Sequence, residues 1–198
     1  EIAGSLGEKK EMEVDVVGGF VRDLLMGSPI NDIDLMTIGE GIPFAEMLAN
    51  ELGRKKIVPF KKFGTALIPG NDIQIEVATA RKESYKGNSR KPSVIIYTDL
   101  EGDLLRRDFT INAMAMNITP LLFGELTDPY GGISDIKKKV IKTPFDPDET
   151  FSEDPLRMMR AAYFASKLGF KLDESCLRSI KRQISRIGIV STERIRDE

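Results

Sequence analysis

Residues 18–34 contain the run Gly18-Gly19-Phe20-Val21-Arg22-Asp23 and, nine residues after Asp23, the triplet Asp32-Ile33-Asp34. Before the glycine pair, residues 14–17 are predicted to form a strand, and after it residues 20–26 are predicted to form a short helix. Glycine lets the backbone approach phosphate oxygens, and the N-terminus of the following helix directs N–H groups at them. We therefore expect a phosphate-binding turn with contacts from Gly18, Gly19 and Arg22, although glycine also serves tight turns that bind no ligand.

Asp32 and Asp34 are two residues apart beside a predicted strand over residues 33–37. Both carboxylates then point to one face of the strand, while Ile33 and Leu35 point to the core. Mg²⁺ prefers such oxygen ligands and completes its coordination with water and substrate phosphate oxygens. The pair predicts a magnesium site beside the glycine turn. The alternative is a pair of carboxylates on a solvated sheet face.

A third carboxylate, Glu76, lies in the alternating run Ile73-Gln74-Ile75-Glu76-Val77, which predicts a strand over residues 73–78. Glu76 and Gln74 share the face opposite the aliphatic side chains. If this strand lies beside residues 33–35, Glu76 completes a cluster of three catalytic carboxylates, which can hold two metal ions about 3.5–4 Å apart. Periodicity alone supports a solvent-facing Glu76 equally well.

The composition limits the chemistry that is open to this chain. Its 198 residues are 41% hydrophobic, enough for one core or for a core with a small helical annex, and none is histidine. The single cysteine, Cys176, forms neither an internal disulfide nor a cysteine-built zinc site. Catalysis would therefore rest on carboxylates, cations and bound metal. No segment has the roughly 20 apolar residues of a membrane span, so we expect no membrane partner and a cytoplasmic location.

Alternating strand and helix patterns predict an α+β sheet domain in the first part of the chain. The turn signal Pro69-Gly70-Asn71-Asp72 predicts a hairpin of residues 65–68 and 73–78. Residues 81–93 lack apolar periodicity and are expected to form a surface loop without regular structure. The other expected elements are a helix over residues 42–52, a strand over 56–59, a strand pattern over 111–117, a turn over 128–132, a helix over 133–138 and a strand over 140–142.

From residue 147 onward the apolar periodicity is helical. A long helix is expected to begin at Ser152-Glu153-Asp154-Pro155 and to end at Gly169, with further helices over residues 173–184 and 192–198. The predicted boundary separates a catalytic domain, residues 1–145, from a helical domain, residues 146–198. From Pro155 onward, the sequence contains ten Lys or Arg residues and five Asp or Glu residues. This balance suits a polyanionic partner, and a solvated helical surface is the alternative.

Two further segments carry groups suited to a nucleotide. In Arg106-Arg107-Asp108-Phe109-Thr110-Ile111-Asn112, the candidates are Arg107 and Asn112, because a guanidinium forms forked hydrogen bonds to phosphate. A helix start with Asp108 as N-cap explains part of this segment equally well. The second segment places Asp154, Arg157 and Arg160 at a spacing of three, which predicts one helix face.

The Asp154 carboxylate beside the Arg157 guanidinium would accept a hydrogen bond from an exocyclic amine and donate one to a ring nitrogen. Cytosine and adenine present that pair of groups, whereas uracil and guanine present a carbonyl and a ring N–H. The pattern therefore predicts selection of C and A. The alternative is a surface ion pair worth roughly 0.2–0.5 kcal/mol.

Together, six segments in order resemble the tRNA nucleotidyltransferase (CCA-adding) and bacterial poly(A) polymerase family: VVGGFVRDLLMGSPINDIDL, IEVATARKESY, LLRRDFTINAMAM, LTDPYGGISDIKKKVIKT, EDPLRMMRAAYFASKLGF and ERIRDE. The resemblance covers residues 14–198. It implies a polymerase-beta-like head, with a mixed sheet flanked by helices, followed by a small all-helical neck. It also implies triphosphate contacts from Gly19 and Arg22, magnesium ligands at Asp32 and Asp34, a nucleotide contact at Arg107, and a base-reading template of Asp154, Arg157 and Arg160.

The function that this resemblance implies is addition of C and A from CTP and ATP to the 3′ end of tRNA or another RNA, with Mg²⁺ as cofactor. Two alternatives stay open: addition of A alone, as by a poly(A) polymerase, and a non-catalytic RNA- or nucleotide-binding module. The chain has Tyr163 where the family often carries an arginine after Arg-Ala-x. It ends with Glu193-Arg194-Ile195-Arg196-Asp197-Glu198, where the family continues into body and tail domains, so we expect a fragment.

Overall fold

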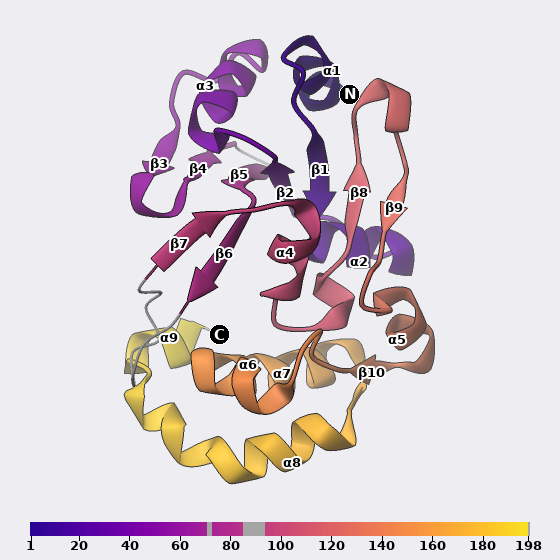
Figure 1. The fold of residues 1–198 in the computed structure, drawn as a ribbon, viewed down its shortest axis with the longest axis vertical. Coiled ribbons are helices and arrows are strands. Elements are labelled where there is room, and N and C mark those ends of the chain that lie inside the picture. Colours follow the sequence, from indigo (N-terminus) through magenta and orange to yellow (C-terminus); the bar gives the residue numbers. More distant parts are fainter. Residues whose placement is uncertain (71–72, 85–93, 198) are drawn as a thin grey trace.

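The computed structural model describes residues 1–70, 73–84 and 94–197. A seven-stranded sheet with helices around it forms the upper part of the molecule, and a group of helices lies beneath it (Figure 1). The sheet has the order β3-β4-β5-β2-β1-β8-β9. These strands are β1 (Val14–Val17), β2 (Asp32–Thr37), β3 (Val58–Phe60), β4 (Thr65–Ile68), β5 (Gln74–Thr79), β8 (Ala115–Asn117) and β9 (Leu126–Thr127). The mixed sheet with flanking helices confirms the predicted fold class.

The two faces of this sheet are covered differently. On one face, Leu35 of β2 packs in a core cluster with Phe44 and Leu48 of α3 (Gly41–Glu51). On the other face, Met36 packs in a second cluster with Leu104 of α4 (Leu100–Leu105). The remaining helices around the sheet are α1 (Ile2–Lys9), α2 (Gly19–Met26) and α5 (Gly132–Lys138), with short 3-10 helices η1 (Lys61–Phe63), η2 (Thr110–Asn112) and η3 (Pro120–Leu122).

The register of β2 and β5 decides which side chains face each other at the start of these strands. The two strands are parallel, and Asp34 lies opposite Glu76. Leu35 and Val77, their neighbours, are both buried on the opposite face. The structure therefore confirms the predicted alternation of side chains in β2 and β5. It also confirms that the two strands are neighbours, which was the condition for bringing Glu76 beside Asp34. β4 and β5 pair antiparallel as the expected hairpin, although Asn71 and Asp72 of its turn lie outside the described residues.

Residues 81–84 do not form the expected loop. They form β6 (Arg81–Ser84), which pairs antiparallel with β7 (Val94–Tyr97) in a separate two-stranded sheet. Backbone pairing needs no apolar alternation, and the Arg81 N–H is also held by a carboxylate oxygen of Asp103 at 3.2 Å. The loop prediction is therefore wrong for this part; residues 85–93 lie outside the described residues.

The lower group consists of α6 (Pro147–Glu153), α7 (Leu156–Leu168), α8 (Glu174–Gln183), η4 (Ile184–Ile189) and α9 (Thr192–Asp197). The long helix expected from Ser152 is interrupted, because Asp154 has an extended conformation (φ −137°, ψ 101°). Extended geometry is favoured in a residue before proline, so Pro155 starts a new helix instead of continuing α6. Gly169 ends α7 in the left-handed conformation, as predicted.

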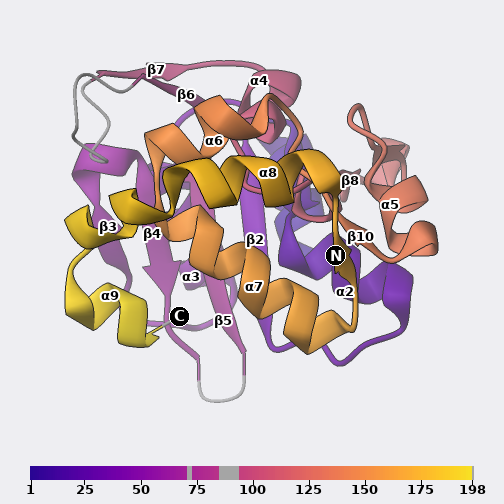
Figure 2. The same ribbon diagram turned by 90° about the horizontal axis from the view of Figure 1, so that it is seen from below.

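The core continues across the predicted domain boundary. Phe109 and Ile141, from the sheet part, pack in one cluster with Phe151, Met158 and Phe164 of the lower helices. Two short strands, β10 (Val140–Ile141) and β11 (Lys171–Leu172), also pair across it. Viewed from below, α7 and α8 both lie beneath the sheet (Figure 2). The division at residue 145 stays a prediction. Within the described residues, no helix is both long and apolar enough to cross a membrane.

Candidate active site

A cavity of about 500 Å³ lies between the glycine turn, the segment after α4 and the inner side of α7. Its walls bring together residues that are up to 176 positions apart in the sequence. They include Asp34 and all eight side chains or backbones predicted to bind nucleotide: Gly18, Gly19, Arg22, Arg107, Asn112, Asp154, Arg157 and Arg160. Asp32 and Glu76 do not line it. The roles of these residues stay predictions.

The glycine turn closes one end of this cavity. Gly18 has φ +67° and ψ −130°, a conformation that only glycine adopts readily, and it precedes the first residue of α2. A Cβ at Gly18 would lie 2.7 Å from Nη1 of Arg107 and 3.6 Å from Oδ2 of Asp34. The backbone turn, a guanidinium and a carboxylate therefore meet at one point, which is the arrangement that a bound phosphate with a metal ion requires.

The carboxylates of β2 and β5 influence one another electrostatically. Burial raises the pKa of Asp34; Arg107 opposes this shift and the neighbouring Asp32 adds to it. Burial, followed by repulsion from Asp34, also raises the pKa of Glu76. Repulsion among these carboxylates adds to the effect of burial in disfavouring their charged forms, and a cation bound between them would relieve that repulsion.

The donor set of β2 fits a magnesium ion. Mg²⁺ is usually bound through one or two carboxylates together with substrate phosphates and water. Asp34 supplies one carboxylate beside the glycine turn, and Asp32, two residues earlier on β2, is the candidate for the second. Within the described residues, no three acidic or cysteine side chains are arranged to hold a metal ion by themselves. The three-carboxylate cluster expected with Glu76 is therefore not preformed as a metal site, and a catalytic role of Glu76 stays a prediction.

Asp103 holds the arginine pair at residues 106 and 107, and the sequence patterns did not single it out. Its side chain is 1% exposed and accepts hydrogen bonds from Arg107 at 3.0 Å and from Arg106 at 2.7 Å. Burial alone would raise the pKa of Asp103, but Arg107 and Arg106 hold it below its usual range. The available signal was its position three and four residues before the two arginines, near the end of α4.

A chain of polar contacts joins α2 to α7 along the cavity wall. Nη1 of Arg22 donates to Oδ1 of Asn112 at 2.6 Å, and Nδ2 of Asn112 donates to Oδ1 of Asp108 at 3.1 Å. Nε of Arg160 donates to the second oxygen of Asp108 at 2.7 Å. Burial alone would raise the pKa of Asp108, but Arg160 and Asn112 hold it below its usual range. Asp108 thus connects two segments and does not cap η2, whose N-cap is Phe109.

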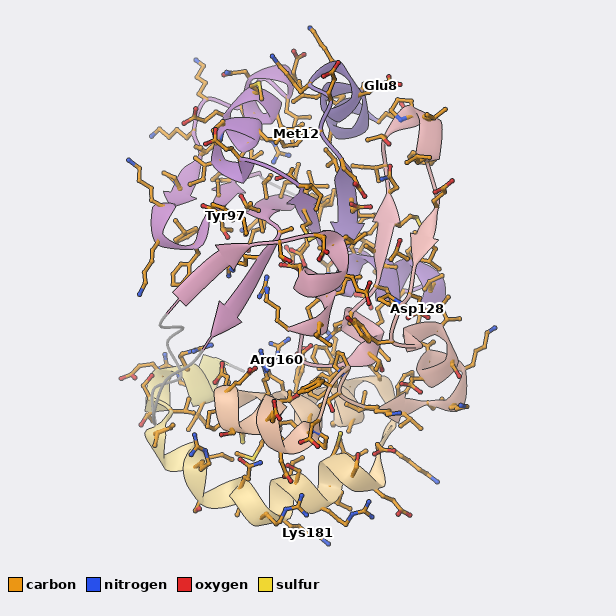
Figure 3. All side chains as sticks on the ribbon, viewed as in Figure 1. Glu8, Met12, Tyr97, Asp128, Arg160 and Lys181 are labelled. Carbon is orange, nitrogen blue, oxygen red and sulfur yellow. The ribbon has the colours of Figure 1, made fainter. Side chains whose placement is uncertain are left out.

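Phe164 lies against both guanidinium groups of that chain. The ring centroid is 5.1 Å from Cζ of Arg22 and 5.2 Å from Cζ of Arg160. Cation–π contacts of this kind fix a guanidinium over a ring and contribute roughly 0.5–2 kcal/mol. Figure 3 labels Arg160 in the region between the lower helices and the sheet. Sequence reasoning missed Phe164, although its spacing of four from Arg160 places the two on one side of α7.

Asp154 and Arg157 both line the cavity, but they do not form the ion pair that was the alternative interpretation. Among the described residues, Arg157 pairs with Glu153 at 3.0 Å, and its second amino group donates to the Arg106 carbonyl at 2.7 Å. Asp154 accepts a hydrogen bond from the Leu156 N–H at 3.1 Å. Asp154 therefore precedes α7 and is not on its face, as the interrupted helix requires.

Comparison with known proteins identifies relatives along most of the chain. A family model described as the poly A polymerase head domain matches residues 14–142. The chain is 41% identical over 170 residues to an A-adding tRNA nucleotidyltransferase of Aquifex aeolicus, covering 86% of this chain and 20% of that protein. It is also 41% identical over 184 residues to a CCA-adding enzyme of Geobacillus sp., covering 92% of this chain and 43% of that protein. The chain therefore spans less than half the length of these relatives.

Solved structures agree with this result. A CCA-adding enzyme in an apo form superimposes with a TM-score of 0.86 at 36% identity, covering 99% of this chain and 46% of that one. A tRNA nucleotidyltransferase complexed with a primer tRNA and an incoming ATP analog gives a TM-score of 0.82 at 35% identity, covering 98% and 53% of the two chains. The polymerase-beta-like head expected from the sequence is confirmed by these matches. The chain belongs to the poly A polymerase head-domain family, together with the CCA-adding and A-adding tRNA nucleotidyltransferases that it resembles.

Proposed function

We propose that this chain is the catalytic and base-reading part of an RNA nucleotidyltransferase that adds C and A from CTP and ATP to the 3′ end of tRNA. One observation carries the proposal: a single cavity brings Asp34 and the Gly18 turn together with Asp154 and Arg157. Asp34 and the Gly18 turn suit a triphosphate and its metal, whereas Asp154 and Arg157 suit the edge of a base. A cytoplasmic location, as expected from the sequence, is part of this proposal.

The proposed reaction is attack of the RNA 3′-hydroxyl on the α-phosphate of the nucleotide, with pyrophosphate as the leaving group. Asp32 and Asp34 would hold Mg²⁺, which when bound supplies activation of the hydroxyl and neutralisation of charge on pyrophosphate. Gly18, Gly19 and Arg22 would orient the phosphates, and Arg107, held by Asp103, would bind the nucleotide near Asp34. Positioning of this kind accounts for much of the rate of such reactions.

Base selection is assigned to the lining at the start of α7. Arg157 lines the cavity, and its hydrogen bonds to Glu153 and to the Arg106 carbonyl restrict the orientation of its guanidinium. Asp154 has one oxygen hydrogen-bonded to the Leu156 N–H, which fixes its carboxylate in the same way. An acceptor and a donor that line the same cavity would match the amine and ring nitrogen of cytosine and adenine.

The second candidate is addition of A alone. An A-adding relative and a CCA-adding relative are equally similar to this chain, at 41% identity, so similarity does not choose between them. The test is incubation of the protein with tRNA lacking its terminal CCA and with labelled CTP, ATP or both, with and without Mg²⁺. Magnesium-dependent growth by C, C and A supports the proposal. Growth by A alone assigns the second candidate, and no growth under any condition assigns a non-catalytic binding module.

A further inference from the structure

The two oxygens of the Asp103 carboxylate serve different partners. Oδ1 accepts hydrogen bonds from Nη2 and Nε of Arg106 at 2.7 and 3.0 Å and from the Arg81 N–H at 3.2 Å. Oδ2 accepts hydrogen bonds from Nη2 and Nε of Arg107 at 3.0 and 3.3 Å. One carboxylate on α4 therefore joins the start of β6 to the arginine pair that follows the helix.

The position of this carboxylate is itself restricted. Asp103 is 1% exposed on α4, which lies beside β6 (Figure 1). Nε of Arg106 also donates to the Arg81 carbonyl at 3.0 Å, so Asp103, Arg106 and Arg81 form a closed ring of contacts. Burial alone would raise the pKa of Asp103, but Arg107 and Arg106 hold it below its usual range, so the carboxylate is charged at neutral pH. Asp103 is therefore an anchored negative charge.

Arg107 uses one edge of its guanidinium for Asp103 and presents the remaining nitrogen to the glycine turn. Nε and Nη2, which form that edge, both donate to Oδ2 of Asp103. Nη1 lies at the turn, because a Cβ built at Gly18 would be 2.7 Å from Nη1 and 3.6 Å from Oδ2 of Asp34. A guanidinium is planar, so fixing one edge also fixes the direction of the other N–H donors. The contact with Asp103 therefore determines where Nη1 lies relative to the turn.

We infer that Asp103 is a positioning residue for nucleotide transfer, which fixes Arg107 at the Gly18 turn and ties its guanidinium to the start of β6. The inference rests on the proposed function, in which Arg107 binds the nucleotide. Asp103 is not among the described residues that line the cavity, so it acts through Arg107. A donor that is held in place before the nucleotide binds needs no reordering in the transition state. Loss of Asp103 should therefore lower kcat more than it weakens nucleotide binding.

The test measures kcat for nucleotide addition to tRNA lacking its terminal CCA, in a double-mutant cycle of Asp103→Asn and Arg107→Gln. Asn offers one side-chain oxygen where Asp offers two, so one guanidinium loses its acceptor. We expect Asp103→Asn to lower kcat roughly tenfold to a hundredfold, the scale of a small misplacement of a group that contacts the substrate. In the Arg107→Gln background, the same change should alter kcat by less than about twofold, because no Arg107 is left to position.

Equilibrium binding of ATP separates positioning from loss of folded structure. Asp103→Asn removes a negative charge beside the cavity, so ATP should bind as tightly as to wild type or more tightly while kcat falls. A merely structural role would lower binding and kcat together, in proportion to the folded fraction that thermal unfolding measures. Asp99→Asn is the matched control on the same helix, because Asp99 caps α4 through the Gly102 N–H and Asn is an equally good cap. It should leave kcat and ATP binding unchanged.

Arg107→Lys gives a test that does not depend on the stability of an Asp103 variant. The Arg107 side chain is 19% exposed, and Lys keeps its charge but lacks the planar fork that Oδ2 of Asp103 holds. We expect kcat to fall nearly as far as in Arg107→Gln.

Two results would overturn the inference. One is independent, multiplicative loss of kcat from Asp103→Asn and Arg107→Gln, and the other is wild-type kcat in Asp103→Asn or Arg107→Lys. Absence of nucleotide incorporation by the wild-type protein would instead contradict the proposed function. In that case, NMR of the Arg107 Nε–H decides the positioning role: Asp103 should hold this group rigid in wild type and release it in Asp103→Asn, and equal rigidity in the two proteins would exclude that role.

Discussion

Arg160 and Asp108 form a 2.7 Å ion pair between α7 and the segment that leads into η2, 52 residues apart in the sequence. Asp108 is 9% exposed and also accepts a hydrogen bond from Asn112, which in turn binds Arg22. The groups proposed to hold the phosphates and the helix proposed to read the base are thereby joined through one carboxylate. This contact links α7 to the cavity wall that carries Asn112 and Arg22.

Removal of the Asp108 charge should weaken both stability and the joint between the two parts. Asp108→Asn leaves the Arg160 guanidinium without its buried partner, so we expect a loss of about 1–3 kcal/mol in the free energy of unfolding at pH 7. The pKa of Asp108 is lowered in the folded state, so its contribution is present above the unfolded pKa and is lost as pH falls through the folded pKa. Denaturant unfolding at pH 7 and in acid measures this.

Glu174→Gln is the control for that variant, because it breaks the Glu174–Arg178 pair, whose side chains are 90% and 62% exposed. It should leave unfolding close to wild type. Equal destabilisation by both variants would mean that the Asp108–Arg160 pair behaves as an ordinary surface contact.

Loss of either β2 carboxylate should abolish nucleotide incorporation. Asp34→Asn and Asp32→Asn each remove a proposed magnesium ligand. We expect the rate of nucleotide incorporation to fall roughly 10³-fold or more, because the metal stabilises the transition state by several kcal/mol. Thermal unfolding should show a folded protein, and Asp34→Asn should be no less stable than wild type, because burial already disfavours its charge. Glu46→Gln, on the exposed side of α3, is the matched control. Full activity in either β2 variant would reject the magnesium role.

A side chain at Gly18 should damage the site more than it damages the fold. Gly18→Ala brings a Cβ to 2.7 Å from Nη1 of Arg107 at a φ of +67°, so either the turn or the guanidinium must move. We expect a raised KM for the nucleotide, with a stability loss of about 1–3 kcal/mol for the strained backbone. Gly124→Ala has a similar strain, at φ +87°, but open space around its Cβ. An unchanged KM in Gly18→Ala would separate the turn from phosphate binding.

Substitution of Asp154 should change base selection, and the two variants should differ. Asp154→Ala removes the acceptor for the exocyclic amine, so we expect the preference for CTP and ATP over UTP and GTP to relax by roughly tenfold, as for one lost hydrogen bond to a charged group. Asp154→Asn keeps an oxygen for the Leu156 N–H and adds an amide donor, which should favour bases with a carbonyl. Competition among the four nucleotides measures both. Unchanged selectivity in both variants would place base recognition elsewhere.

Asp15 should make the protein less stable as pH rises toward neutrality. This carboxyl lies on central strand β1, is 2% exposed, and has one oxygen without a hydrogen-bond partner. Burial, followed by repulsion from Glu13, raises the pKa of Asp15 from 3.8 to about 7. The folded state then binds more protons than the unfolded state between these two values, so stability declines as pH increases across that interval and levels off above it.

Asp15→Asn removes this titration and keeps the size of the side chain. Relative to the variant, wild type should lose about 2 kcal/mol in the free energy of unfolding between pH 5.5 and pH 8, at roughly 1.4 kcal/mol per pH unit until the folded pKa is reached. A pH-independent difference between the two proteins would show that Asp15 is ionised throughout that range.

Local chemistry in the sequence was sufficient to predict most elements of the sheet. The glycine pair ends β1 and starts α2 because only a residue without Cβ adopts the Gly18 conformation. The alternation in β2 and β5 gave the correct faces, since side chains in a strand alternate whatever the partner strand is. The prediction of a loop at residues 81–84 was wrong because β6 forms by pairing with β7. The sequence of residues 81–84 carries no local signal of that pairing.

The cavity itself is a property of the tertiary structure. Spacing and family resemblance in the sequence identified many of the residues that line it. They did not show that Asp154 precedes α7 and is not part of it. They also did not show that Asp108 and Asp103 pair with the arginines. Spacing rules act over three or four residues, whereas these contacts join segments up to 52 residues apart or depend on burial. Sequence periodicity determines which side chains share a face. Packing of α7 against the sheet determines which faces meet, and that packing forms the cavity.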